Sequence, residues 1–189
     1  MKRLAPLALA ACILVLAACA PIESATPAPS GVVLWGDSFG ESVKPHLPAN
    51  YEVRAYGGTA PCDWLADIRR TVARRPPEIA VLLFVGNTYT ACTGGTTAGY
   101  AGDVAEATVL LRAAGSEVVI IAAPPFGAGP SPNPVNAAYE PSGARLVWGP
   151  SASVAPGGVY SQAYREPDGI HLNWAGAVRF AEAIRLEVG

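Results

Sequence analysis

One serine of this chain stands in a context that is typical of an enzyme nucleophile. Ser38 lies in the stretch VVLWGDSFGES, directly after a short apolar run. The five residues from Gly36 to Gly40 fit the G-x-S-x-G pattern of a nucleophile elbow. A serine hydroxyl reacts poorly unless a base takes its proton, and that base is usually a histidine. The two histidines of the chain are therefore the next residues to consider.

His171 is the better candidate for this base. Asp168 stands three residues before it in EPDGIHLN, and in a turn this spacing lets a carboxylate fix the tautomer of the imidazole. A plainer interpretation also exists, in which Asp168-Gly169 is only a turn and His171 a surface residue before a helix capped by Asn173. We expect His46 to lie at the end of a short helix, facing solvent. The candidate catalytic residues are thus Ser38, Asp168 and His171.

Alternating strands and helices would position these residues. Continuous apolar runs predict strands that are covered on both faces, and helical candidates lie between them. The strands are expected at 32–35, 51–56, 79–85, 117–123 and 144–148, and the helices at 63–74, 98–114 and 173–188. This alternation predicts a parallel sheet between two layers of helices. The proline-rich stretch 126–142 is expected to be a surface segment with at most one short helix, and such segments often contact substrate.

Polar residues follow three of the expected strands. Ser38 follows the first, Gly57-Gly58-Thr59 the second and Asn87 the third. In an open α/β sheet, ligands bind beyond the carboxyl ends of the strands. The sequence therefore predicts one site that these three loops share.

The first 18 residues have the pattern of an export signal. A cationic start is followed by an apolar run that contains Pro6 and is shorter than the ~20 residues of a spanning helix. The run ends in Leu16-Ala17-Ala18-Cys19, which resembles the lipobox of bacterial lipoproteins. We therefore expect cleavage before Cys19, lipidation of Cys19, and a protein anchored to the outer face of the cell membrane. The alternative is a soluble secreted protein with a coincidental cysteine.

The remainder of the chain is expected to form one domain. Residues 19–30 would be the lipidated N-terminus and a flexible Pro/Ala/Ser-rich stalk, and residues 31–189 the folded part. Without Lys2 and Arg3, 11 basic residues face 15 acidic ones, a net charge of −4. This balance argues against nucleic acid or an anionic membrane surface as a partner. We expect a monomer.

Cys62 and Cys92 are the two thiols left once Cys12 leaves with the signal and Cys19 carries lipid. In an oxidising compartment they are expected to form a disulfide, which would stabilise the fold by about 3–4 kcal/mol. A metal pair is the alternative, but no C-x-x-C motif or histidine-rich partner accompanies them. We expect no metal and no cofactor.

The motifs GDS at 36–38 and DGIH at 168–171 give the chain a resemblance to the GDSL, or SGNH, hydrolases, a superfamily of esterases, lipases and carbohydrate deacetylases. The resemblance implies a three-layer α/β/α sandwich around a flavodoxin-like parallel five-stranded sheet. It also implies that Ser38 is the nucleophile, His171 its base and Asp168 the residue that orients His171.

The same resemblance implies an oxyanion hole. Its donors would be the Ser38 N–H, the N–H of Gly57 or Gly58, of which we favour Gly58, and the side chain of Asn87. The family usually shows G-x-N, whereas here Gly86 directly precedes Asn87. The resemblance therefore does not determine the backbone conformation at Asn87. If the family's strand order holds, the second and third strands flank the first. A Cys62–Cys92 disulfide would then fix the two loops that carry the oxyanion donors.

The expected activity is a serine esterase acting on short acyl esters, such as O-acetyl groups on envelope glycans. An O-acyltransferase with the same residues is one alternative, and a non-catalytic lipoprotein of this fold that binds glycan or protein is another. An α/β-hydrolase shares the order Ser, Asp, His, but only about seven residues of folded domain precede Ser38, too few for its early strands. Metal-dependent hydrolysis has no H-E-x-x-H motif to support it.

Overall fold

A computed structural model of the protein describes residues 30–126 and 132–189. The expected signal at 1–18, the lipidation site Cys19 and the stalk up to residue 29 lie outside these described residues. Within the described ranges, no helix combines the length and the apolar character that crossing a membrane requires.

Five parallel strands form one sheet in the order β2-β1-β3-β4-β5. Strand β1, which lies between β2 and β3, has Val33, Leu34 and Trp35 fully buried, which explains its uninterrupted apolar sequence. The strands are β1 (Ser30–Gly36), β2 (Tyr51–Ala55), β3 (Pro77–Leu83), β4 (Glu117–Ile121) and β5 (Arg145–Val147). All five predicted strands are confirmed, and so is the prediction that the second and third flank the first.

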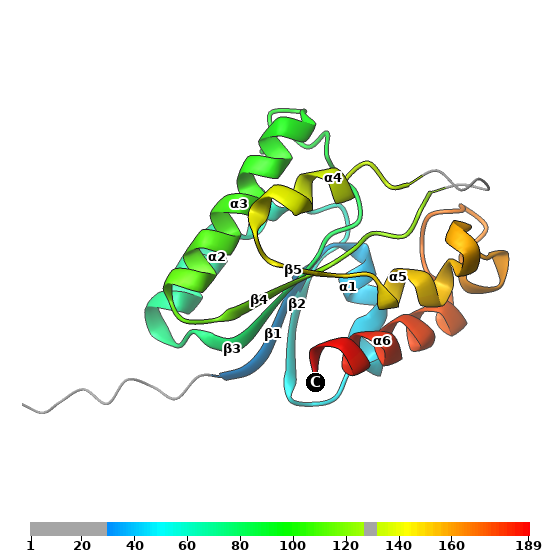
Figure 1. The fold of residues 1–189 in the computed structure, drawn as a ribbon, viewed down its shortest axis with the longest axis horizontal. Helices are drawn as coiled ribbons and strands as arrows, with labels where there is room; N and C mark the ends of the chain where they lie inside the picture. The colour runs from blue at the N-terminus through cyan, green and yellow to red at the C-terminus, as the bar shows by residue number, and fades with distance from the viewer. Residues whose placement is uncertain (1–29, 127–131) are drawn as a thin grey trace, which may run out of the picture.

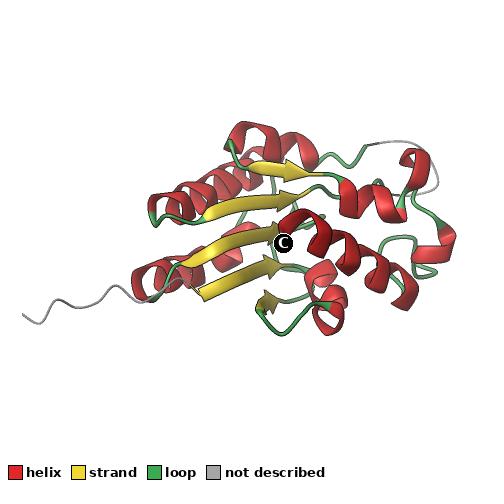
Figure 2. Cartoon of the chain, turned by 60° about the horizontal axis from the view of Figure 1, so that its bottom comes forward, coloured by secondary structure: helices red, strands yellow, loops and turns green. Residues whose placement is uncertain are grey.

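Helices cover both faces of the sheet, which confirms the three-layer α/β/α architecture (Figure 1, Figure 2). One layer holds α2 and α3, and the other holds α1, α5 and α6, whose members pack on one another. The helices are α1 (Ser38–Val43), α2 (Pro61–Arg74), α3 (Thr97–Ala113), α4 (Asn136–Tyr139), α5 (Gly149–Val154) and α6 (Trp174–Val188), and short 3₁₀ turns include η1 (Lys44–His46) and η2 (Glu140–Ser142).

Two expectations for the chain outside the main elements are confirmed only in part. Of the segment 126–142, the described residues 132–142 contain one short α-helix, as expected. They are not confined to the surface, because α4 buries Tyr139, whose hydroxyl contacts the Tyr100 hydroxyl at 3.1 Å and the Phe84 carbonyl. His46 does end a short helix, but its ring packs edge-on against Trp174, with 5.9 Å between ring centroids, instead of facing solvent alone. In both cases a tertiary contact from a distant segment decides the outcome, and local sequence does not report it.

Candidate active site

Ser38 opens α1 at the carboxyl end of β1, the strand between β2 and β3. The preceding residue, Asp37, caps this helix: its Oδ1 accepts from the Phe39 N–H at 3.0 Å. Its Oδ2 accepts from the Val85 N–H at 2.8 Å, beyond the end of β3. Asp37 therefore ties the Ser38 turn to the neighbouring loop that carries Asn87.

Asp37 is fully buried, and this burial governs its protonation. Removal from water raises the pKa of its carboxyl to about 6, while the backbone N–H groups of Val85 and Phe39 and the charge of His171 act in the opposite direction. Desolvation outweighs the hydrogen bonds here. The loss of solvation disfavours the ionised form that those N–H groups would otherwise stabilise.

Asp168 and His171 form the pair that the sequence predicts. His171 Nδ1 lies 2.6 Å from Asp168 Oδ2, and the other carboxylate oxygen accepts from the N–H groups of Ile170 and His171 at 2.8 and 3.0 Å. The hydrogen bond with the His171 ring is the main cause that lowers the pKa of Asp168 to about 2. Gly169, with φ of +77°, allows the tight turn that brings the two side chains together. An ionised Asp168 thus holds His171 with Nε2 directed away from it.

Ser38 and His171 lie on packed elements but are not hydrogen-bonded to each other in the described part of the chain. Helix α1 packs on α6 through Phe39 and Phe180, whose ring centroids are 5.7 Å apart in an edge-on contact. His171 precedes α6 by three residues, and its charge is close enough to lower the pKa of Asp37, the neighbour of Ser38. Catalytic hydrogen bonds are often long without substrate, so this arrangement is compatible with a nucleophile and its base.

Gly57, and not Gly58, lies against Ser38. A Cβ built on Gly57 would be 3.8 Å from the Ser38 Cβ, whereas one built on Gly58 would have no atom within 4 Å. Gly58 instead has a φ of +79° and forms the turn after β2, a conformation that glycine adopts without strain. The geometry therefore favours Gly57 over the Gly58 that the sequence led us to prefer.

The N–H of Gly57 already has a partner, which the sequence did not indicate. It donates to Glu41 Oε2 at 2.8 Å, and Glu41 lies three residues after Ser38, on α1. No motif marks Glu41. Only its position, one helical turn from Ser38, could have drawn attention to it.

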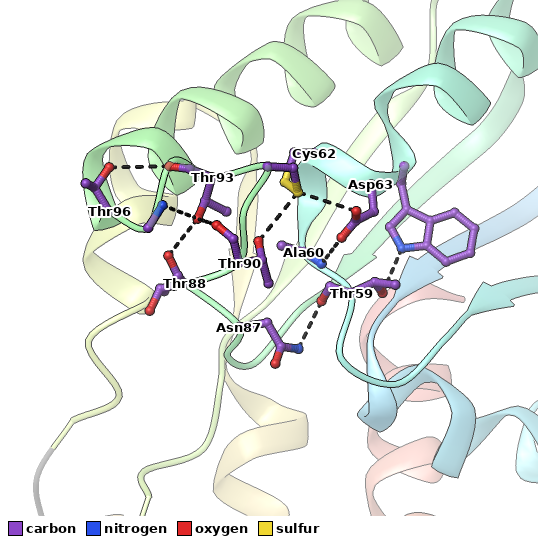
Figure 3. The surroundings of a disulfide bond; sticks show 12 residues. Thr59, Ala60, Cys62, Asp63, Asn87, Thr88, Thr90, Thr93 and Thr96 are labelled. Carbon is purple, nitrogen blue, oxygen red and sulfur yellow. Dashed lines mark hydrogen bonds between the residues drawn. A yellow bond between two sulfur atoms is a disulfide. The ribbon is translucent and has the colours of Figure 1, made fainter.

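Asn87 follows β3 and is held in an unusual conformation. Its φ is +62°, the left-handed region that residues other than glycine seldom adopt, and it is the one such residue in the described ranges. Its Nδ2 donates to the Thr59 carbonyl at 3.0 Å, so it reaches across to the loop after β2 (Figure 3). An amide nitrogen carries two hydrogens, and this bond uses one of them.

The predicted disulfide between Cys62 and Cys92 is confirmed. It joins the start of α2 to the loop after β3, beside the hydrogen bond between Asn87 and Thr59 (Figure 3). The indole N–H of Trp64 also donates to the Thr59 hydroxyl at 3.0 Å. A covalent bond and side-chain hydrogen bonds thus hold the two loops on either side of the end of β1.

The described residues include one group whose side chains could approach a metal ion together, namely Cys62, Asp63 and Cys92. The two sulfurs are bonded to each other, and a thiolate is needed for metal ligation. That leaves the Asp63 carboxylate, which already accepts from the Ala60 N–H at 2.8 Å and caps α2. This group is therefore a disulfide beside a helix cap.

No protein-family model matches this sequence, and no curated protein does either. Solved structures with the same fold are numerous. A GDSL-like lipase from Bacteroides thetaiotaomicron is 18% identical, with 84% of this chain and 87% of that chain covered and a TM-score of 0.63. The psychrotrophic esterase EstA from Pseudoalteromonas sp. is 10% identical, with coverage of 85% and 97% and a TM-score of 0.65.

A carbohydrate esterase family 3 structure from Talaromyces cellulolyticus is 16% identical, with 84% of this chain and 95% of that chain covered and a TM-score of 0.58. At identities this low, the similarity establishes a shared fold. The activity has to be argued from the residues of this chain.

Proposed function

We propose that this protein is a serine esterase that hydrolyses short acyl esters. The observation that carries the proposal is the 2.6 Å contact between His171 Nδ1 and Asp168 Oδ2, on a turn that leads into a helix packed against the Ser38 helix. An imidazole held in this way has Nε2 free to take a proton. The esterase and lipase folds that resemble this chain support the same reaction class.

In the first half of the reaction, the Ser38 hydroxyl attacks the ester carbonyl while His171 Nε2 takes its proton. The resulting imidazolium is stabilised by the ionised Asp168, and it returns the proton to the leaving alcohol. In the second half, water attacks the acyl group on Ser38, again with His171 as the base. The acid is released and Ser38 regains its proton.

The negative charge on the carbonyl oxygen needs hydrogen-bond donors. We assign this role to the N–H of Ser38, the N–H of Gly57 and the second hydrogen of Asn87 Nδ2. The bond of Asn87 to Thr59 can persist during the reaction, because it uses only one amide hydrogen. Gly57 has a single N–H, so the exposed Glu41 side chain must move away before Gly57 can donate to the substrate.

O-acetyl groups on envelope glycans are the proposed natural substrate, because an exported and anchored enzyme would meet them first. This part of the proposal depends on lipidation at Cys19. We also propose that the protein acts as a monomer. Cell fractionation of wild type and Cys19→Ala tests the anchor. We expect the variant to leave the membrane fraction, and its retention there would show that lipidation is not what holds the protein.

Hydrolysis of p-nitrophenyl acetate tests the activity. We expect turnover by the wild type and its loss in Ser38→Ala and His171→Ala, with the fold checked by circular dichroism. Ser42→Ala and His46→Ala are matched controls, because Ser42 lies on the same helix as Ser38 and His46 is the other histidine of the chain, and both variants are expected to remain active. Turnover that survives in Ser38→Ala would refute the proposal.

The same assay separates the two alternative functions. Acyl transfer to an added sugar that outpaces release of free acid would favour an O-acyltransferase. A wild type without turnover, together with glycan binding that persists in Ser38→Ala, would favour a binding protein.

A further inference from the structure

A groove opens beside Asn87, at the ends of β3 and β4. Its volume is about 510 Å³. One wall is the loop after β3, with Asn87, Thr88 and Tyr89, and the other is formed by Phe126 and the segment from Asn133 to Val135. The ring of Phe126 packs against the backbone of this loop: a Cβ built on Gly86 would lie 3.6 Å from the ring.

Most of the accessible surface that lines the groove is apolar. None of the lining residues is charged. The buried amide of Asn133 has its bonds satisfied within the protein: it donates to the carbonyls of Val85 and Pro124, and its oxygen accepts from the Val135 N–H. The most exposed lining side chains are Tyr89 and Pro134, beside the half-buried ring of Phe126, whereas Val135 is only 2% exposed. Asn87, Thr88 and Thr90, also half-buried, add polar groups on the side of the loop after β3.

Tyr89 is the most exposed aromatic residue among those described, with 82% of its surface accessible. An exposed aromatic ring beside an apolar groove gains most by covering an apolar ligand. The volume is about three times the ~150 Å³ cavity that holds benzene in an engineered protein. The groove therefore has room for a short alkyl chain or an aromatic ring, which is more than an acetyl group needs.

The groove lies next to the candidate active site. Asn87 belongs to both, and the Val85 N–H, two residues earlier, is held by Asp37, the neighbour of Ser38. Strands β1 and β3 are adjacent, with Gly36 paired to Leu83, and neighbouring strands lie about 4.8 Å apart. A carbonyl held between Ser38 and Asn87 would thus lie at the mouth of the groove.

From these observations we propose that the groove binds an apolar part of the ester substrate, either the acyl chain or the alcohol. The proposal rests on the esterase function proposed above. It makes Tyr89 and Phe126 specificity determinants: they favour esters that carry an alkyl or aromatic group over the smallest acetates. An O-acetylated glycan carries no such apolar group, so confirmation of the groove would replace that proposed substrate and leave the esterase function intact.

Two ester series test this proposal and identify the source of the apolar group. One is p-nitrophenyl acetate, butyrate and hexanoate, which varies the acyl chain, and the other is ethyl, butyl and hexyl acetate, which varies the alcohol. A fully buried methylene is worth about fourfold in binding, so we expect kcat/KM to rise at least about tenfold along one series. A rise in the first assigns the groove to the acyl chain, and a rise in the second assigns it to the alcohol. A flat response in both overturns the proposal.

Variants connect this preference to the groove. We expect Tyr89→Ala and Phe126→Ala to lower the ratio of long-chain to short-chain kcat/KM several-fold. Trp148→Ala is the matched control, because it removes a half-exposed aromatic residue from a different cavity, lined also by Ala152 and Gly157. An unchanged ratio in the first two variants, or a ratio that falls only in Trp148→Ala, would contradict the assignment.

Failure of the esterase function would be recognised separately, as absence of turnover on every ester. Binding of hexan-1-ol, followed by the backbone NMR shifts of Thr88, Tyr89 and Val135, then tests the groove without turnover. We expect these shifts to saturate in the wild type and to weaken in Tyr89→Ala. No response at these residues would overturn the groove as an apolar site.

Discussion

At the scale of single residues, the contact between Glu41 and Gly57 is the feature that bears most directly on reactivity. A carboxylate oxygen accepts the N–H that we assign to the oxyanion hole. Hydrogen bonds to charged groups are stronger than neutral ones, although exposure to solvent weakens this one. Glu41 therefore competes with the substrate for the donor.

We expect Glu41→Ala to raise kcat/KM for p-nitrophenyl acetate by about two- to tenfold, because the donor no longer has to exchange partners. Glu41→Gln should give a smaller gain, since its neutral oxygen can still accept from Gly57. Glu182→Ala, another exposed glutamate, is the control and should have no effect. A fall in kcat/KM in Glu41→Ala would show that Glu41 supports the Gly57 turn instead.

Asp168→Asn tests the role of the carboxylate in orienting His171. The amide oxygen can still accept from the N–H groups of Ile170 and His171, so the turn should persist. The amide nitrogen would instead donate to His171 Nδ1. The imidazole proton then sits on Nε2, so Nε2 can no longer take the proton of Ser38. We expect kcat to fall at least about 10²-fold with KM little changed. A variant with nearly wild-type kcat would remove Asp168 from the mechanism.

The buried Asp37 makes a prediction about stability and pH. Its pKa is raised from 3.8 to about 6, so the folded protein binds this proton more tightly than the unfolded chain does. The stabilisation from this proton is complete below about pH 4 and is lost as the pH rises to about 6. The loss amounts to about 3 kcal/mol.

Urea unfolding of wild type and Asp37→Asn at pH 4 and pH 7 measures this effect. The free energy of unfolding of the wild type, relative to the variant, should decrease between these two pH values. Other titrating groups are common to both proteins and cancel in the comparison. A difference that does not change with pH would mean that Asp37 has an ordinary pKa.

The sequence predicted the residues whose chemistry is local, and it missed those that depend on contacts. Asp168 and His171 are three residues apart, so a turn alone brings them together. Glu41 meets Gly57 only because β2 lies beside β1, and the choice between Gly57 and Gly58 depends on the same packing. Residue spacing along the chain does not contain this information.

At the scale of elements, the disulfide and the loops after β2 and β3 form one unit. The Cys62–Cys92 bond and the hydrogen bond from Asn87 to Thr59 both join these loops. Asn87 also needs support, because its positive φ is costly for a residue with a side chain. The disulfide therefore has a part in positioning Asn87 as well as in stability.

Cys62→Ser/Cys92→Ser tests both parts. The closed loop spans 30 residues, for which the chain-entropy model gives a loss of about 3–4 kcal/mol in the free energy of unfolding, measurable in urea. We also expect a lower kcat, since Asn87 is less well held. Dithiothreitol should reproduce both changes in the wild type and have no effect on the variant. Unchanged kcat in the reduced, folded protein would limit the disulfide to stability.

Strands were more predictable than short helices. Every strand is marked by an apolar run, because the helices on both faces exclude water from it. Helix α5 has the sequence GPSASV, with too few large apolar residues to show a period, yet it buries Val154 and Ser151. Likewise, α4 lies in a proline-rich stretch, and only its contacts with α3 reveal that it is part of the core.

At the scale of the whole molecule, the strand order explains where the site lies. The chain passes from β1 to β2 on one side and from β3 to β4 on the other, so the loops after β1 and β3 diverge. Such switch points form the ligand-binding crevices of parallel sheets. Ser38, Gly57 and Asn87 follow β1, β2 and β3, and His171 reaches the site from the turn before α6. The sequence predicted this arrangement through alternation and motif, but the atomic partners required the folded chain.

Covalent labelling of Ser38 is the most direct test of the proposed mechanism. A fluorophosphonate reacts with an activated serine and leaves an adduct that intact-mass measurement and peptide mapping can locate. We predict one adduct per chain, on Ser38, present in Ser42→Ala, absent in Ser38→Ala and strongly reduced in His171→Ala. An unlabelled wild type, or an adduct on another residue, would contradict the assignment of Ser38 as the nucleophile.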